Sequence, residues 1–144
     1  PGDSVLDIGC GKGYLLYEFQ QLGMKTHGID ISQYAIDNAK PEIKPLLQGC
    51  CTNLPFKESS FDLVVCINVL HNLSYTDLKT AIREINHVSR KNAYICVESY
   101  RNDIEMMHLQ MWALTCQSFY SSTDWQAILD DNDYCGDLEL IFFP

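Results

Sequence analysis

Three closely spaced glycines between a strand and a helix constrain this chain more than any other feature. Residues 4–8 (SVLDI) form a short apolar run typical of a buried strand, and residues 14–22 (YLLYEFQQL) have the apolar spacing of an amphipathic helix. Gly9, Gly11 and Gly13 lie between them. Glycine permits a tight turn, and without a Cβ the N–H groups at the start of the helix can face a ligand directly. The pattern predicts a strand, turn and helix, either with a ligand at the turn or as a turn alone.

Strand-like and helix-like segments alternate through the next part of the chain. The segment 61–68 is apolar almost throughout, as expected for a central parallel strand covered on both faces. The alternation predicts an α/β fold: a Rossmann-like, doubly wound, mostly parallel sheet in a three-layer α/β/α sandwich. After the first strand, strands are expected at 24–30, 46–50, 61–68 and 93–99. One helix is expected to begin after Ser32 and to end at Pro41, and another to begin at a Thr76 cap and to end at Val88.

The segment 101–144 has a different character, and we expect it to form the acceptor side of one domain that covers 1–144. Apolar residues occur on two faces of a predicted helix that includes Ile104 and Leu114, which favours a helix that is buried or covers a pocket. A capping box at Thr123 predicts a short helix to about Asp130, and 136–143 is a predicted strand. The chain begins with Pro rather than Met, so we also expect that an N-terminal segment of the domain is missing.

Charge and cysteine usage limit the classes of partner and compartment. The net charge is −9 and the pI is about 4.7, with no cluster of basic residues, which argues against direct binding to nucleic acid or to an anionic membrane. The seven cysteines are odd in number and form no C-x-x-C pair. They indicate buried thiols in a reducing cytoplasm rather than a disulfide scaffold or a metal site.

The spacing of the glycines distinguishes two kinds of ligand. A dinucleotide fingerprint is G-x-G-x-x-G, whereas this chain has D-x-G-x-G-x-G beginning at Asp7. In this respect the chain resembles the class I S-adenosylmethionine-dependent methyltransferases. The resemblance implies that Gly9, Cys10, Gly11 and Gly13 wrap the methionine half of S-adenosylmethionine, and that Asp7 orients its ammonium group directly or through water.

A second acidic residue, Asp30, ends the second predicted strand. At the tip of a strand beside the glycine turn, its carboxylate can accept hydrogen bonds from both hydroxyls of a ribose. A helix-capping or surface role is the structural alternative. In the family that the chain resembles, the following residue, Ile31, would lie against the face of the adenine ring.

The segment from Gly49 to Val64 resembles the G-D-A-x-x-L-P-F … S-F-D-L-V signature of the small-molecule branch, typified by enzymes of quinone and biotin biosynthesis. Cys50 stands where that branch usually has an Asp that accepts a hydrogen bond from the adenine amino group, and a thiol is a weak acceptor. By resemblance Cys51, Thr52 and Asn53 belong to the cofactor site. The Cys51 N–H is expected to reach the adenine ring, and Asn53 or a backbone carbonyl to replace the missing Asp.

The segment Asn68-Val69-Leu70-His71-Asn72-Leu73 follows the fourth predicted strand and resembles the family's V-L-H-H-L segment. The resemblance implies that the Asn68 backbone contacts the methionine portion. His71 is the candidate general base because imidazole titrates near neutral pH. A packed or cofactor-shielding histidine is the alternative. Glu98, with Tyr100 and Arg101, ends the fifth strand and would form part of the acceptor pocket.

These features together predict an enzyme that transfers the methyl group of S-adenosylmethionine to an O, N or C atom of a small molecule by direct displacement. No catalytic triad is needed, since alignment supplies much of the acceleration. Three alternatives stay open: a protein or RNA methyltransferase whose recognition elements lie outside this segment, a non-catalytic S-adenosylmethionine-binding module favoured by Cys50, and a nicotinamide-dependent oxidoreductase.

Overall fold

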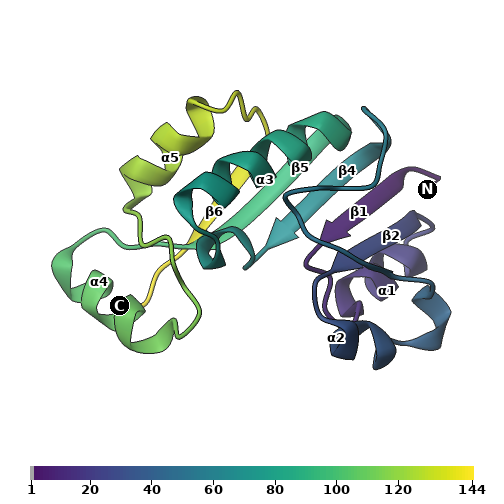
Figure 1. The fold of residues 1–144 in the computed structure, drawn as a ribbon, viewed down its shortest axis with the longest axis horizontal. Helices are drawn as coiled ribbons and strands as arrows, with labels where there is room; N and C mark the ends of the chain where they lie inside the picture. Colours follow the sequence, from purple (N-terminus) through teal and green to yellow (C-terminus); the bar gives the residue numbers. More distant parts are fainter. Residues whose placement is uncertain (1) are drawn as a thin grey trace.

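The computed structural model describes residues 2–144, which form a six-stranded, wholly parallel sheet (Figure 1). The strand order is β3-β2-β1-β4-β5-β6. The chain runs outward from β1 to β3, then returns to place β4 against the other side of β1, so the winding reverses between β1 and β4. The strands are β1 (Ser4–Ile8), β2 (Lys25–Asp30), β3 (Leu47–Gln48), β4 (Phe61–Ile67), β5 (Ser89–Glu98) and β6 (Asp137–Ile141).

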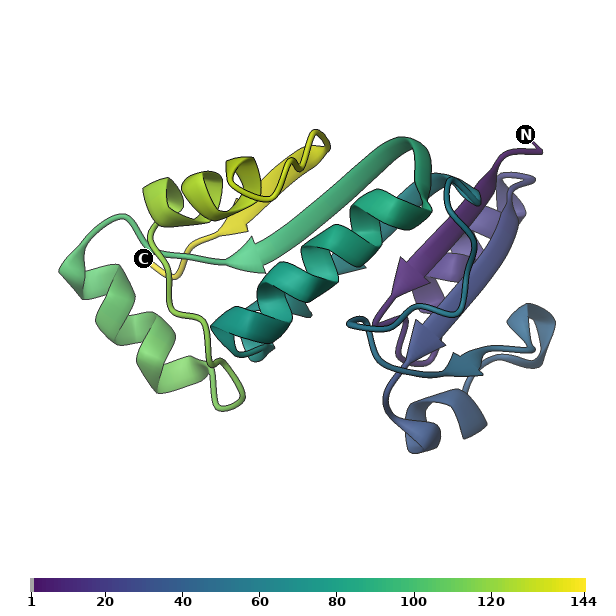
Figure 2. The same cartoon turned by 45° about the horizontal axis from the view of Figure 1, so that its top comes forward.

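Helices cover both faces of this sheet, which confirms the predicted Rossmann-like three-layer fold (Figure 2). One face packs against α1 and α2, and the other against α3 and α5. Every helix within residues 2–144 is too short or too polar to cross a lipid bilayer. The helices are α1 (Tyr14–Gln21), α2 (Gln33–Asp37), the 3-10 turn η1 (Pro41–Ile43), the 3-10 turn η2 (Leu70–Asn72), α3 (Tyr75–Val88), α4 (Asp103–Trp112) and α5 (Ser122–Asp130).

The central strands are buried because their side chains alternate between two apolar layers. Leu6 of β1 and Val64 of β4 belong to the layer under α3 and α5, whereas Val5 and Val65 belong to the layer under α1 and α2. Successive residues of a strand point to opposite faces, so a strand covered on both sides has to be apolar at nearly every position. Trp125 of α5 is fully buried in the first layer.

Several predicted boundaries were wrong. The fifth strand begins at Ser89 rather than at residue 93, and α2 ends at Asp37 rather than at Pro41. The N-cap of α3 is Ser74, whose side chain accepts a hydrogen bond from the Asp77 N–H, so the helix begins before Thr76. The capping box of α5 joins Ser121 to Asp124 rather than starting at Thr123. The third strand has only two residues, both exposed, instead of the predicted five. At the start of α3 and of α5 several Ser or Thr residues could cap, and backbone conformation selects one of them.

The prediction that the first helix of the segment 101–144 is buried, or covers a pocket, was also wrong. α4 lies beyond the carboxyl end of β5, away from the faces of the sheet (Figures 1 and 2). Only Glu105 and Leu109 of this helix are buried, while Met111 and Trp112 are about three-quarters exposed (73% and 75%). A helix placed past the end of a sheet has no apolar layer to receive its second face.

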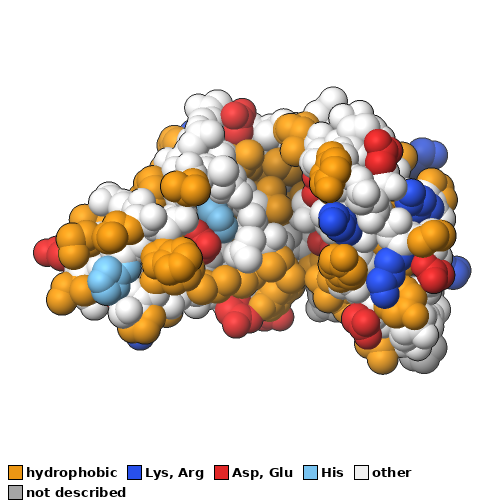
Figure 3. All heavy atoms as spheres, turned by 90° about the horizontal axis from the view of Figure 1, so that it is seen from below, with side chains coloured by type: hydrophobic (Ala, Val, Ile, Leu, Met, Phe, Trp, Pro, Cys, Tyr) orange, Lys and Arg blue, Asp and Glu red, His pale blue; other side chains and the backbone are white. Residues whose placement is uncertain are grey.

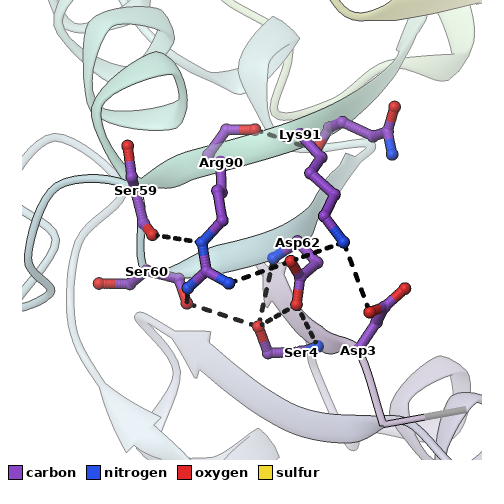
Figure 4. Close-up of polar contacts among 9 residues, drawn as sticks. Asp3, Ser4, Ser59, Ser60, Asp62, Arg90 and Lys91 are labelled. Carbon is purple, nitrogen blue, oxygen red and sulfur yellow. Dashed lines mark hydrogen bonds and ion pairs between the residues drawn. The ribbon is translucent and has the colours of Figure 1, made fainter.

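At the amino ends of the strands, Asp62 joins three strands through one carboxylate (Figure 4). Its Oδ2 atom accepts hydrogen bonds from the Ser4 N–H at 3.0 Å and the Ser4 hydroxyl at 3.1 Å. Its Oδ1 atom pairs with Arg90 Nη1 at 3.1 Å and with Lys91 Nζ at 3.2 Å. These donors, first the Ser4 N–H, lower the pKa of Asp62 to about 2. The network connects β1, β4 and β5 at the edge opposite to the carboxyl ends.

We predict that Asp62→Asn lowers the urea midpoint at neutral pH and that this difference disappears in acid. The folded-state pKa of Asp62 is about 2 and its ordinary value is 3.8. The carboxylate therefore stabilises the fold above about pH 4, and this contribution is lost as the pH falls toward about 2. Urea titrations across this range test the prediction, with Glu58→Gln, an exposed carboxylate in the loop before β4, as the control. A midpoint difference that persists undiminished in acid would contradict it.

Candidate functional site

A cavity of about 390 Å³ lies at the carboxyl ends of β1, β2 and β4, where the winding of the sheet reverses. Ligands of open α/β sheets bind at this position. The surface is hollowed on the side where these strands end (Figure 3). The lining comes from the ends of four strands and the loops after them: Ile8, Gly9, Ile29, Asp30, Ile31, Gly49, Cys50, Cys51, Ile67, Asn68, Val69, Asn72 and Leu73.

The turn after β1 requires glycine for two separate reasons. Gly9, Gly11 and Gly13 all have positive φ angles, of 76°, 53° and 74°. A Cβ atom on Gly9 would overlap the Val69 side chain, whereas a Cβ on Gly11 would meet nothing within 4 Å. Gly9 therefore gives the room in which the loops after β1 and β4 approach each other. Gly11 faces open space, which leaves the backbone of the turn accessible.

Asp30 fixes this turn to the end of β2. Its Oδ2 atom accepts a hydrogen bond from the Gly11 N–H at 2.8 Å, and its Oδ1 atom accepts one from the Ser32 N–H at 2.8 Å. An ionised carboxylate has about four acceptor sites. Each oxygen thus keeps acceptor capacity for a ligand hydroxyl. Sequence reasoning assigned Asp30 to the ligand, with a helix-capping or surface role as the alternative, and missed its contact with the turn.

Asp7 is a buried carboxyl group without a compensating cation. It is only 4% exposed, and burial, followed by the neighbouring Asp30 carboxylate, raises its pKa to about 7. Within residues 2–144 its carboxyl group takes part in no hydrogen bond or ion pair of the protein. A cationic ligand group would favour the ionised form of Asp7 and so oppose both causes of the raised pKa. Together with Asp30, the site fits a ligand that has a positive charge and hydroxyl groups.

The two adjacent cysteines, Cys50 and Cys51, line the cavity after β3. Cys50 Sγ lies 3.0 Å from the Thr52 hydroxyl, and its hydrogen bonds to the Thr52 side chain and backbone lower the pKa of the thiol. Thr52 and Asn53 do not line the cavity, and the Asn53 N–H donates to the Cys50 carbonyl at 3.1 Å. Of the two expected replacements for the family Asp at position 50, Asn53 and a backbone carbonyl, Asn53 thus lies outside the lining of the cavity.

The loop after β4 brings Asn68 to the cavity and turns His71 away from it. Asn68 has a φ of 58°, and its N–H donates to the Cys96 carbonyl of β5 at 2.9 Å. His71, 5% exposed, does not line the cavity. Its Nδ1 accepts a hydrogen bond from the Glu98 N–H at 3.4 Å, and its Nε2 lies 3.6 Å from Glu98 Oε2. Burial lowers the pKa of His71, against the opposing effect of the Glu98 carboxylate.

The structure thus separates the sequence-predicted residues into three groups. One group lines the cavity: Gly9, Asp30, Ile31, Cys51 and Asn68. A second group lies at the end of β1 and in the turn beside the cavity: Asp7, Cys10, Gly11 and Gly13. The third group lies outside the lining: Thr52, Asn53 and His71. Sequence reasoning missed Ile67, Val69, Asn72 and Leu73, which also line the cavity. Their position directly after an apolar central strand was the signal that could have identified them.

We predict that Gly9→Ala is more destabilising than Gly11→Ala, although both residues have positive φ. The φ angle alone costs about 1–2 kcal/mol in each variant. Gly9→Ala adds about 1–3 kcal/mol because the new methyl group overlaps Val69. Combining Gly9→Ala with Val69→Ala should therefore show a favourable coupling of about 1 kcal/mol in urea unfolding. Equal costs for the two single variants, or strict additivity in the double variant, would be inconsistent with the overlap.

We predict that Asp7→Asn stabilises the free protein at alkaline pH. The folded-state pKa of Asp7 is about 7, above its ordinary 3.8, so folding disfavours the charged form and stability falls as the pH rises between these values. An amide has no charge to desolvate, so at about pH 8 the variant should gain up to about 4 kcal/mol, with the gain vanishing below about pH 4. The free energy of unfolding in urea at both pH values measures this effect, with Glu58→Gln as the control. A loss of stability at alkaline pH would show that Asp7 is compensated in the free protein.

Comparisons with known proteins agree with this geometry. A family model described as a methyltransferase domain matches residues 6–97. The uncharacterized methyltransferase sll0829 of Synechocystis is 29% identical over 133 residues, covering 91% of this chain and 63% of that protein. The crystal structure of YcgJ from Bacillus subtilis has a TM-score of 0.74 at 25% identity, covering 91% of this chain and 61% of its own.

A further solved structure, a putative methyltransferase in complex with the Haloferax volcanii Trm112 methyltransferase activator, has the same fold, with a TM-score of 0.74 at 23% identity. The matched region covers 91% of this chain and 61% of the chain in that structure. This chain spans less than two thirds of the length of each of these relatives. Because the family model covers more than half of the residues, the chain belongs to the family of methyltransferase domains.

Proposed function

We propose that this domain binds S-adenosylmethionine and transfers its methyl group to an acceptor. The observation that carries the proposal is the pair of carboxyl groups, Asp7 and Asp30, beside a side-chain-free turn at the point where the winding reverses. Within residues 2–144 neither carboxyl group has a Lys or Arg partner. When bound, S-adenosylmethionine supplies a methyl group already activated by a positively charged sulfur, so the protein has mainly to bind and align.

Each cavity residue has a role that its geometry supports. Asp7 would hold the ammonium group of the methionine portion, which places a cation beside a buried carboxylate. Asp30 would accept the ribose hydroxyls with the acceptor capacity left by its two backbone hydrogen bonds. Ile31, whose side chain is exposed at the rim, and the Cys51 N–H would contact the adenine ring, and the Asn68 backbone the methionine portion.

The remaining residues of the predicted cofactor site would act through the backbone or through a neighbouring residue. Gly9, Cys10, Gly11 and Gly13 would form the cradle for the methionine half, since any side chain at Gly9 would collide with the facing loop. Thr52 would act through its hydroxyl on Cys50 rather than by direct contact. Asn53 would keep the loop after β3 in place through its N–H bond to the Cys50 carbonyl.

The acceptor that we propose is an O, N or C atom of a small molecule. The acidic net charge and the absence of a basic cluster in the sequence favour it over direct binding to RNA. A protein or RNA acceptor recognised by elements outside this segment is the principal alternative, and a non-catalytic binding module is a further one. Turnover to S-adenosylhomocysteine separates the enzyme from the module.

We predict that Asp30→Ala weakens S-adenosylmethionine binding by about 1–3 kcal/mol, because it removes charge-assisted hydrogen bonds and releases the turn. Isothermal titration of the free protein with S-adenosylmethionine measures the change. Asp62→Asn is the matched control, because Asp62 lies at the opposite edge of the sheet and should leave the affinity of the folded protein unchanged.

Two results would count against the proposal. Unchanged affinity in Asp30→Ala would remove Asp30 from the ligand site. Binding of a nicotinamide dinucleotide, but not of S-adenosylmethionine, by the wild-type protein would replace the methyltransferase with an oxidoreductase.

A further inference from the structure

A second polar site, the Glu98–His71 pair, lies next to the cofactor cavity on the other side of η2. Asn72 and Leu73 line the cavity, while His71, one residue earlier, packs against Glu98 at the end of β5. The three consecutive residues from His71 to Leu73 therefore contribute both to the cofactor cavity and to the Glu98–His71 pair. The Glu98 side chain is 20% exposed, so it can be reached from solvent although most of it is withdrawn from water.

The hydrogen bonds of His71 define which of its nitrogens holds the proton. Nδ1 accepts the Glu98 N–H, so it has no proton of its own. In the neutral ring the proton is then on Nε2, which faces Glu98 Oε2 at 3.6 Å. The Nε2–H group of His71 thus lies beside the Glu98 carboxylate, and the one basic lone pair of the ring is occupied by the backbone. This arrangement is poorly suited to a general base and well suited to orienting a carboxylate.

Within residues 2–144 the Glu98 carboxylate has no Lys or Arg partner, and burial favours the neutral form of the His71 imidazole beside it. The nearest basic residue along the chain, Arg101, is paired with Glu105 of α4, and its guanidinium group lies over the Phe142 ring at 4.3 Å from the ring centre. A carboxylate that is largely withdrawn from water and has only a neutral imidazole and the Cys116 thiol near it lacks a counter-ion. A cationic ligand group would supply one.

The surroundings hold this pair in a fixed position. The Trp125 indole N–H donates to the Glu98 carbonyl at 3.2 Å, and the N–H groups of Gln117 and Ser118 donate to the His71 carbonyl at 2.8 and 3.0 Å. The Ser118 hydroxyl donates to the Leu73 carbonyl at 2.6 Å. The segment before α5 is therefore attached to His71 in the middle of η2 and to Leu73 directly after it, and the Glu98–His71 pair lies between the cofactor cavity and the segment 101–144.

We propose that Glu98 is the binding group for a protonated amine of the methyl acceptor, and that His71 is a positioning residue that orients Glu98. The inference rests on the proposed function, and it narrows the acceptor to the class of amines. Glu98 binds the ammonium group as an ion pair, and the His71 Nε2–H holds the second side of the carboxylate.

The test uses n-butylammonium and n-butanol as a matched cationic and neutral probe of the free protein. We expect n-butylammonium to shift the imidazole NMR signals of His71 in a saturable way, and n-butanol at the same concentration to leave them unchanged. Glu98→Gln should weaken the ammonium affinity at least about fivefold, because the ion pair is lost. Glu58→Gln is the control for a general loss of negative charge. Equal responses to the two probes, or an unchanged affinity in Glu98→Gln, would overturn the inference.

The role of His71 has its own readouts. Long-range ¹H–¹⁵N spectra should show a neutral imidazole protonated at Nε2, and His71→Gln, whose amide can donate from a similar position, should keep more of the ammonium affinity than His71→Phe. A ring protonated at Nδ1, or equal affinities in the two variants, would exclude the positioning role. Because these measurements need no cofactor, they are separate from the titration with S-adenosylmethionine, whose failure in the wild-type protein would instead overturn the proposed function.

Discussion

The hydrogen bond from the Gly11 N–H to Asp30 connects the two sides of the candidate site, and the rest of the site depends on it. It joins the turn after β1 to the end of β2, and the Ser32 N–H binds the second oxygen of the same carboxylate. Gly11 has a φ of 53° and open space around its missing side chain, so the turn is fixed without being covered. One carboxylate can therefore shape the cavity and still accept hydrogen bonds from a ligand.

The buried carboxyl groups at the amino ends and at the carboxyl ends of the strands have pKa values shifted in opposite directions. At the amino edge, Asp62 is surrounded by donors from Ser4, Arg90 and Lys91, and its pKa is lowered to about 2. At the carboxyl edge, Asp7 is buried without a cation and its pKa is raised to about 7. The first arrangement stabilises the fold, whereas the second leaves an electrostatic cost that only a cationic ligand relieves. Such uncompensated, perturbed groups gather at functional sites.

The sequence was sufficient to predict an element where the local pattern of residues agrees with burial. It was insufficient where contacts between distant residues determine the structure. The glycine turn could be predicted because its positive φ angles favour glycine at those positions. The strand 61–67 could be predicted because burial on both faces requires apolar residues along its length. The capping residue Ser74 could not be distinguished from Thr76, since both types cap and only the backbone selects. The exposure of α4 depends on where the sheet ends, which no local pattern contains.

His71 shows how a long-range contact changes the chemistry of a residue that local sequence describes correctly. Its place after a central strand predicts a residue near the reaction centre, and the residues beside it do line the cavity. Its ring, however, accepts the N–H of Glu98 from the next strand, and its carbonyl accepts the N–H groups of Gln117 and Ser118. The residues from His71 to Leu73 thereby contribute to the lining of the cavity, contact Glu98 and hold the segment before α5. Because the segment before α5 is attached to the loop after β4 through the His71 carbonyl, a change in that segment can move His71 and Glu98 while the glycine turn and Asp30 stay in place.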